Sequence, residues 1–167
     1  MATIANERAS SLNSTIGGKD SAGRNVNVCV DYSDKATMTW EYTGTVDVSK
    51  TAPSDRMGLS LKDLQEQKGN LAQGWTDKIG DTQNNRTQIG LNAFSQIGGW
   101  TDSGKFRFWS KEIRALLSLF GNHEDGHTLD GRHEDDDKNT SKSKEEQANN
   151  PNSLMNNGAP GSDVSPE

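Results

Sequence analysis

All histidines of this chain lie in HEDGHTLDGRH, residues 123 to 133. His123 and His127 are four residues apart, and this spacing places two side chains on the same face of a helix. Two imidazoles arranged in this way can bind one Zn²⁺ at about 2.0–2.1 Å. Glu124 completes the pattern H-E-x-x-H, in which the glutamate accepts a proton from a metal-bound water and is not itself a ligand. The segment therefore predicts a hydrolytic zinc site, with Glu124 as its catalytic base.

His133 extends this motif, because it follows His127 by six positions. Histidines scattered at random would take both spacings roughly once in 10⁴ trials or fewer, so the longer pattern is far more specific than five residues alone. The pattern resembles that of the metzincin metallopeptidases. In that family the helix ends after the second histidine, and a glycine turn brings the third histidine to the metal. The resemblance implies that His133 is the third ligand of one catalytic Zn²⁺.

A second resemblance lies in SLMNNG, residues 153 to 158. It looks like the Met-turn of the same family, where a methionine forms an apolar floor beneath the three histidines. The resemblance implies this role for Met155, which follows His133 by 22 residues. An apolar floor holds the imidazoles in position without binding the metal.

Three residues depart from the family pattern. Asp130 takes the position of the turn glycine, and aspartate tolerates a left-handed backbone better than most residues, so we expect the turn to be kept. Asp125 would lie opposite the histidines on a helix, where it replaces a bulky apolar residue, so we expect looser packing. Asn157 replaces a tyrosine that assists the tetrahedral intermediate, which implies three histidines plus water around the metal.

The site requires a supporting helix, and residues 110 to 129 have the strongest helical pattern. Ser110 is a suitable N-cap, and an apolar stripe at i, i+3, i+4 and i+7 shares its face with both histidines of the first motif. Gly121-Asn122 is a common helix stop, so a loop is the alternative. An internal glycine costs only about 1 kcal/mol relative to alanine, and packing can override it. The stripe consists of Ile113, Leu116, Leu117 and Phe120.

Period-2 and helical patterns upstream predict a mixed fold. The fold class expected from them and from the resemblance is α+β, zincin-like, with a small twisted sheet over the active-site helix and a long irregular C-terminal segment. Strand patterns cover 26–30, 38–49 (with a turn or bulge at Gly44) and 105–109, and the pattern at 87–100 is ambiguous. Helical spacing covers 59–71 and, less clearly, 4–12.

A length of 167 residues predicts a single domain. The resemblance divides it into an upper subdomain over 1–122, the zinc site and Met-turn over 123–158, and a disordered tail over 159–167. A hydrophobic content of 29% indicates a small core, whose stability a bound metal would increase. Cys29 is the only cysteine, which excludes an intrachain disulfide and favours a buried structural thiol over a zinc-capping one.

Composition also restricts the partners. A formal charge of −6 argues against nucleic acid, and no apolar run is long enough to span a bilayer. Residues 1–20 lack the pattern of a secretory signal, although the resemblance favours an extracellular location. Residues 135–146 partly imitate a Ca²⁺ loop, but Thr140 occupies the glycine position, so a surface charge run is favoured. Nothing indicates the oligomeric state.

The leading hypothesis is a zinc-dependent endopeptidase that hydrolyses protein or peptide substrates, with His123, His127 and His133 as ligands and Glu124 as base. The alternative is a non-catalytic metal-binding or structural protein with an acidic, disordered C-terminal segment that scavenges divalent ions. A third interpretation is a degenerate metzincin that binds zinc but cleaves nothing.

Overall fold

The structure, a computed structural model, describes residues 2–16, 18–19, 24–26, 33 and 35–131. Its class is mixed α+β, as the sequence predicts. The α-helices are α1 (Ala2–Ile16), α2 (Leu61–Leu64) and α3 (Lys111–Thr128), and segments of other helix types lie at Pro53–Asp55, Gln65–Gly69 and Leu91–Ile97. The strands are β1 (Gly18–Lys19), β2 (Asn25–Val26), β3 (Met38–Thr43), β4 (Gly74–Thr76) and β5 (Asn85–Gly90). In this described part, no helix combines the length and apolar character needed to cross a membrane.

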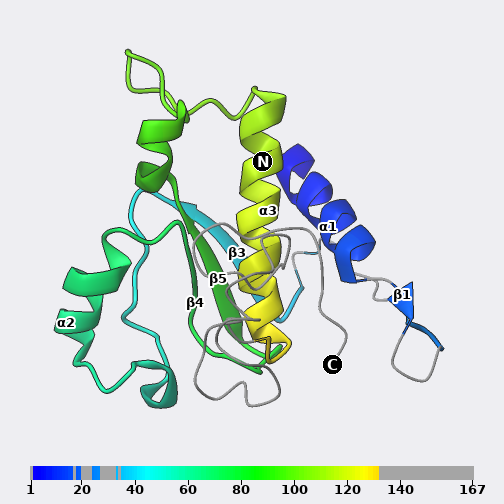
Figure 1. Ribbon diagram of the computed structural model, residues 1–167, viewed down its shortest axis with the longest axis vertical. Helices are drawn as coiled ribbons and strands as arrows, with labels where there is room; N and C mark the ends of the chain where they lie inside the picture. The colour runs from blue at the N-terminus through cyan, green and yellow to red at the C-terminus, as the bar shows by residue number, and fades with distance from the viewer. Residues whose placement is uncertain (1, 17, 20–23, 27–32, 34, 132–167) are drawn as a thin grey trace, which may run out of the picture.

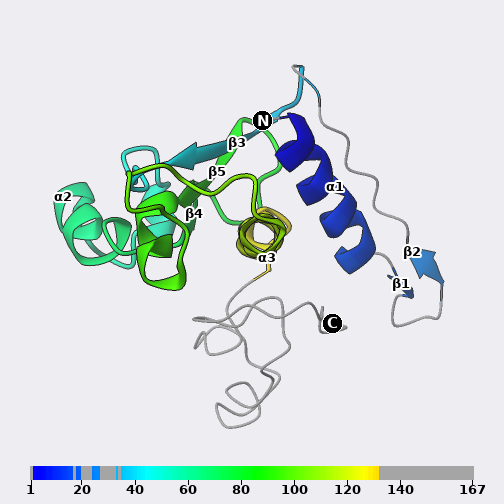
Figure 2. The same cartoon turned by 90° about the horizontal axis from the view of Figure 1, so that it is seen from above.

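Three strands form the sheet that supports the site, in the order β3-β5-β4. The central strand β5 runs parallel to β3 and antiparallel to β4, and every residue of β5 is buried. The long helix α3 packs against β4 and β5, and α1 lies beside α3 (Figure 1). Figure 2 shows α3 end-on, with the sheet and α1 on different sides of it. The helix is therefore held from two directions.

Among the described residues, buried apolar side chains form two core clusters. The larger cluster lies where β5 and the chain that follows it meet α3, and aromatic rings in edge-on contact fill it. The smaller one joins the chain after β3 to α2. Members of the first cluster are Ile89, Leu91, Phe94, Phe106, Ile113 and Leu117. Members of the second are Val46, Val48 and Leu64. Two stripe residues of the predicted helix, Ile113 and Leu117, are thus in the main core.

The helical expectations are confirmed, with two differences in extent. Helix α3 begins after Ser110, whose hydroxyl accepts from the N–H of Ile113, and it runs through Gly121-Asn122 without a break. Helix α1 is longer than the predicted 4–12. The segment 59–71 is α-helical only over α2 and continues as a wider turn to Gly69.

The strand expectations are confirmed in part. Strand β3 covers the first half of 38–49 and ends before Gly44. The ambiguous 87–100 is strand only as far as Gly90 and then turns into a helical segment. The prediction of a strand at 105–109 is wrong, because Phe106 makes only an isolated bridge to Trp100 there, although it joins the main core. Strand β2 includes Val26, while 27–30 lie outside the described residues.

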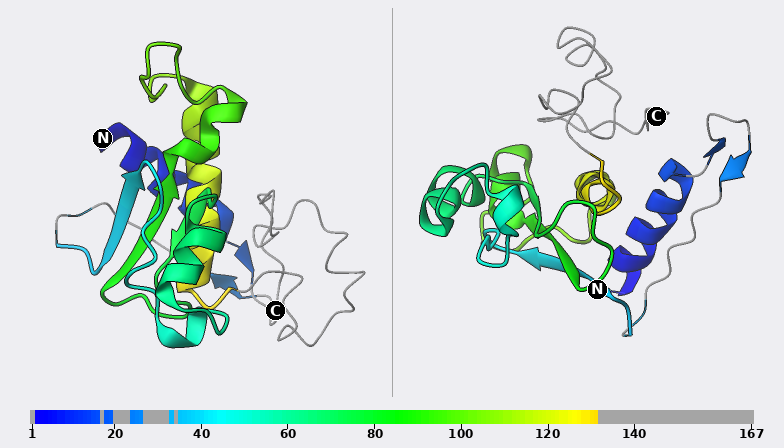
Figure 3. Two further views of the ribbon diagram at one scale, coloured as in Figure 1. Left: turned by 90° about the vertical axis from the view of Figure 1, so that its left-hand side faces the viewer. Right: turned by 90° about the horizontal axis from the view of Figure 1, so that it is seen from below.

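Helix α3 continues through Gly121, and the buried Arg8 of α1 lies against this glycine. A Cβ at position 121 would come within 2.5 Å of Arg8 Nε, and Arg8 Nη2 donates to the carbonyl of Gly121 at 3.1 Å. The absence of a side chain therefore lets α1 and α3 approach. Figure 3 shows the two helices from two further directions.

We expect Gly121→Ala to destabilise the protein even though alanine is the better helix former. The added methyl group must displace Arg8, at a cost of about 1–3 kcal/mol, and the gain in helix propensity offsets only about 1 kcal/mol of it. Urea unfolding measures the effect. Ala115→Gly, at an exposed site on the same helix, gives the propensity difference alone. A more stable Gly121→Ala protein would contradict the close contact.

Candidate metal site

The two histidines of the helical motif lie side by side in the interior. His123 and His127 are 7% and 8% exposed, and their ring centroids are 4.8 Å apart in an edge-on arrangement. One ligand atom from each of His123, Glu124 and His127 lies within 4.8 Å of the other two. The prediction that the helix aims both imidazoles inward is confirmed, and the alternative of a loop is excluded.

The backbone at the end of α3 fixes the orientation of the second histidine. Nδ1 of His127 lies 2.8 Å from the carbonyl oxygen of Gly131. A carbonyl only accepts, so Nδ1 carries a proton in this contact, and in the neutral ring the lone pair is then on Nε2. A hydrogen bond of this kind fixes the tautomer in which an imidazole binds a metal.

The helix ends in the turn that the sequence predicts. Asp130 has a φ of 67°, in the left-handed region, which aspartate tolerates better than most residues. The N–H of Gly131 donates to Gly126 at 2.9 Å and the N–H of Asp130 donates to His127 at 3.2 Å, a Schellman pattern. The description ends at residue 131, so His133 lies outside it.

Glu124 is held against strand β4. The Thr76 hydroxyl lies 2.8 Å from Glu124 Oε2 and also 2.8 Å from the Glu124 carbonyl. Gly74 leaves room for the carboxyl, because a Cβ there would be 2.4 Å from Oε1. Burial raises the pKa of Glu124 to about 8, with the nearby Asp125 adding to the rise and Thr76 and Arg8 opposing it. The residue is thus a buried carboxyl with a high affinity for protons.

We expect the metal-free protein to lose stability as the pH rises from about 5 to about 8. Between the usual pKa of 4.5 and the folded value of about 8, the folded protein keeps a proton on Glu124 that the unfolded chain has released, so folding is favoured at the lower pH. The loss is a few kcal/mol. Urea unfolding at several pH values, with a chelator present, measures it. Glu124→Gln removes this contribution, and equal slopes for both proteins would contradict the assignment.

Asp125 does not loosen the packing of α3, and that expectation is wrong. Its side chain is 1% exposed and accepts hydrogen bonds from three elements. Arg8 of α1 donates twice, at 2.7 and 3.1 Å, Trp40 Nε1 of β3 donates at 3.0 Å, and the Thr87 hydroxyl of β5 donates at 3.2 Å. Its position opposite the histidines is as predicted, but there it anchors the helix.

Sequence reasoning missed the residues that support the motif, among them Arg8, Trp40, Thr76 and Gly74. One signal was present, since Arg8 interrupts the apolar face formed by Ile4 and Leu12 in α1. An arginine at such a position needs a buried acidic partner. The remaining contacts depend on how separate strands come together, which local patterns do not show.

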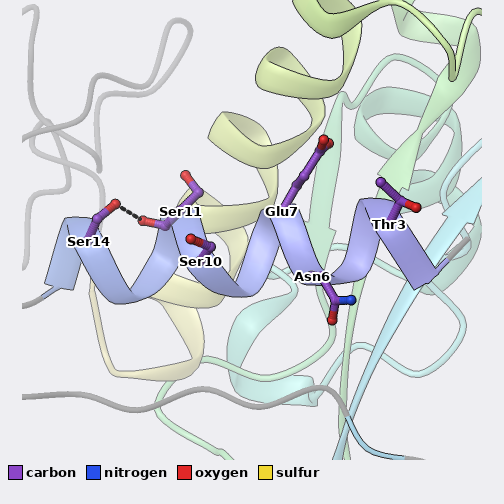
Figure 4. A pocket seen from close by; sticks show the side chains of 6 residues that line it. All are labelled: Thr3, Asn6, Glu7, Ser10, Ser11 and Ser14. Atoms are coloured by element: carbon purple, nitrogen blue, oxygen red, sulfur yellow. Dashed lines mark hydrogen bonds between the residues drawn. The ribbon is translucent and has the colours of Figure 1, made fainter.

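Other predicted features fall outside the described residues: Met155, Asn157, Cys29 and the calcium-like segment 135–146. A pocket in the described part lies on α1 and is lined by none of the site residues, and Figure 4 shows its polar lining. The lining residues are Thr3, Asn6, Glu7, Ser10, Ser11 and Ser14.

Comparison with protein-family models, with curated proteins and with solved structures finds no match for this chain. The chemistry of the site itself is therefore the basis for inferring a function.

Proposed function

We propose that this chain is a zinc-dependent endopeptidase of the metzincin type, with a zincin-like arrangement of sheet and active-site helix. The observation that carries the proposal is that one ring nitrogen from each of His123 and His127 and one carboxylate oxygen of Glu124 lie within 4.8 Å of one another, all three residues being buried. The donor set suits zinc, which binds imidazole nitrogen in catalytic sites. His133 would be the third ligand beyond the turn at Asp130, and Met155 would form the floor.

The residues of the chain would divide the reaction between them. When bound, zinc would lower the pKa of a water in its open position and polarise the scissile carbonyl. Glu124 would take the proton of the attacking water and pass it to the leaving amine. A nearby cation favours the charged carboxylate, which makes the buried Glu124 available as a base. Thr76 would hold this carboxyl in place through its hydrogen bond.

The sheet favours a peptide as substrate. Strand β4 lies at one end of the order β3-β5-β4, and its residues Gly74 and Thr76 contact Glu124. An extended peptide can add to an edge strand through main-chain hydrogen bonds. A substrate bound in this way would pass directly beside the proposed base.

The test is zinc binding by the full chain, measured by metal analysis after dialysis, together with chelator-sensitive cleavage of an unfolded protein. We expect tight, stoichiometric zinc, and we expect His127→Gln and His133→Ala each to weaken zinc binding by at least about 100-fold. If the wild-type protein binds no stoichiometric zinc, or shows no chelator-sensitive cleavage, the proposed peptidase activity is refuted.

A matched variant separates this site from an acidic tail that scavenges metal. Replacing Asp135, Asp136 and Asp137 together with asparagine removes charge beside the motif and leaves its histidines intact. We expect this variant to keep its tight zinc. The opposite pattern, with zinc lost here and kept in His127→Gln, would support the non-catalytic alternative.

A further inference from the structure

One carboxylate joins α3 to three other elements. Asp125 Oδ1 accepts from Arg8 Nη2 at 2.7 Å, from Trp40 Nε1 at 3.0 Å and from the Thr87 hydroxyl at 3.2 Å, while Oδ2 accepts from Arg8 Nε at 3.1 Å. Thr87 in turn accepts from Arg8 Nη2 at 2.7 Å. Helix α1 and strands β3 and β5 therefore each donate a hydrogen bond to the same side chain of α3, that of Asp125.

Arg8 is enclosed at this point. Its side chain is 0% exposed, and its guanidinium carbon lies 4.3 Å from the centre of the Trp40 ring. Gly121 lets it pass close to the helix. Two parallel donors from a planar guanidinium fix both the distance and the direction of the carboxylate that they bind. An apolar side chain would fill the same space without fixing that direction.

The position of Asp125 in the sequence makes this direction relevant to the metal. It lies two residues from His123 and two from His127, which is about 200° around the helix axis from each. A turn of α3 by only 10° would move side-chain atoms about 6 Å from the axis by about 1 Å. Errors of about this size in a reacting geometry reduce rates by roughly 100-fold.

We propose that Arg8 is a positioning residue for the site on α3, which acts through Asp125 by fixing the rotation of the helix about its own axis. This inference rests on the proposed function for its effect on catalysis. Its effect on metal geometry needs only that the histidines bind a metal.

The test compares Co²⁺-loaded full-length proteins. Removing one member of a buried pair leaves a bare charge, so the main variant is Arg8→Met/Asp125→Asn, which neutralises both and keeps an acceptor for Trp40 and Thr87. We expect it to fold and to bind stoichiometric Co²⁺, with altered d–d absorption. We expect kcat to fall by about 10-fold to 100-fold, with KM changed by less than about 2-fold.

The second variant is Arg8→Lys, which keeps the charge and loses the paired donors. It decides the question if the double variant does not fold. We expect the same spectral change and a smaller loss of kcat. Wild-type absorption and kcat in a folded double variant, or in Arg8→Lys if that alone folds, would overturn the proposal.

The matched control is Glu7→Gln/Arg114→Met. This pair also joins α1 to α3, with Arg114 Nε donating to Glu7 at 2.7 Å, but Arg114 lies nine residues before His123 and does not contact Asp125. We expect an unchanged Co²⁺ spectrum. A spectral change equal to that of the double variant would show that docking of α1 in general is responsible, and would also overturn the specific role of Arg8.

The two proposals fail in different ways. A wild-type protein that binds stoichiometric Co²⁺ but cleaves no protein refutes the peptidase, and the spectra still decide the role of Arg8. A wild-type protein that binds no Co²⁺ refutes both.

Discussion

Glu124→Gln is expected to lower kcat/KM for protein cleavage by about 10²–10⁴-fold while zinc stays bound. Glutamine has nearly the same shape as glutamate, so it fits against Gly74 and can still accept from Thr76. It has no basic carboxylate, and the attacking water then has no acceptor for its proton. Zinc content by metal analysis and initial rates of cleavage are measured on the same sample.

The control for this loss is Glu112→Gln, at an exposed position in the first turn of the same helix. It removes the same charge from α3 far from the histidines, and its cleavage rate should equal that of the wild type. Full activity in Glu124→Gln would show that Glu124 is not the catalytic base. Loss of zinc along with activity would instead give Glu124 the role of a ligand.

Asp125→Ala is expected to cost about 3–5 kcal/mol of unfolding free energy, the largest effect on stability that we predict for one substitution. It leaves the guanidinium of Arg8 buried without its counter-charge, and it removes the acceptor of Trp40 and of Thr87. Burial alone would lower the pKa of Arg8, and in the wild type Asp125 and Tyr42 together more than offset burial, so the pKa is raised. A guanidinium stays protonated in proteins even without a partner, so the variant cannot avoid the cost by losing that proton. Urea unfolding at constant pH measures the change.

Glu7→Ala provides the comparison, because Glu7 also pairs with an arginine across the α1–α3 contact but is 39% exposed. A pair open to solvent contributes at most about 1 kcal/mol. If Asp125→Ala cost no more than Glu7→Ala, the buried carboxylate would not anchor the helix.

The sequence was sufficient to predict those features that depend only on residues close together in the chain. The N-cap at Ser110, the apolar stripe and the spacing of His123 and His127 lie within one helix, so their geometry follows from 3.6 residues per turn. The turn at Asp130 follows in the same way from the backbone preference of aspartate. At Gly121-Asn122 the local sequence favours the end of a helix, but α3 continues through these residues and packs against its neighbours.

The rest depends on segments that are far apart in the chain. The fully buried strand β5 contains Asn85, Arg86, Thr87 and Gln88, and polar residues of this kind do not show the alternation of a half-buried strand. The support of Glu124 by Gly74 and Thr76 exists only after β4 has packed against α3, and the support of Asp125 by Arg8 only after α1 has packed against α3. A residue pattern shows which polar side chains are present in the chain, but not which distant residues form hydrogen bonds or ion pairs with them.

The contact between Arg8 and Asp125 joins residues 117 positions apart. Such long-range closures come late in folding, because chain entropy opposes them until other contacts have formed. During synthesis on the ribosome, α1 emerges long before its counterpart and remains without it until almost all of the described chain has been made. If His123 and His127 bind zinc as proposed, the newborn polypeptide would acquire the fixed geometry of that site only after α3 has been made and α1 has packed against it.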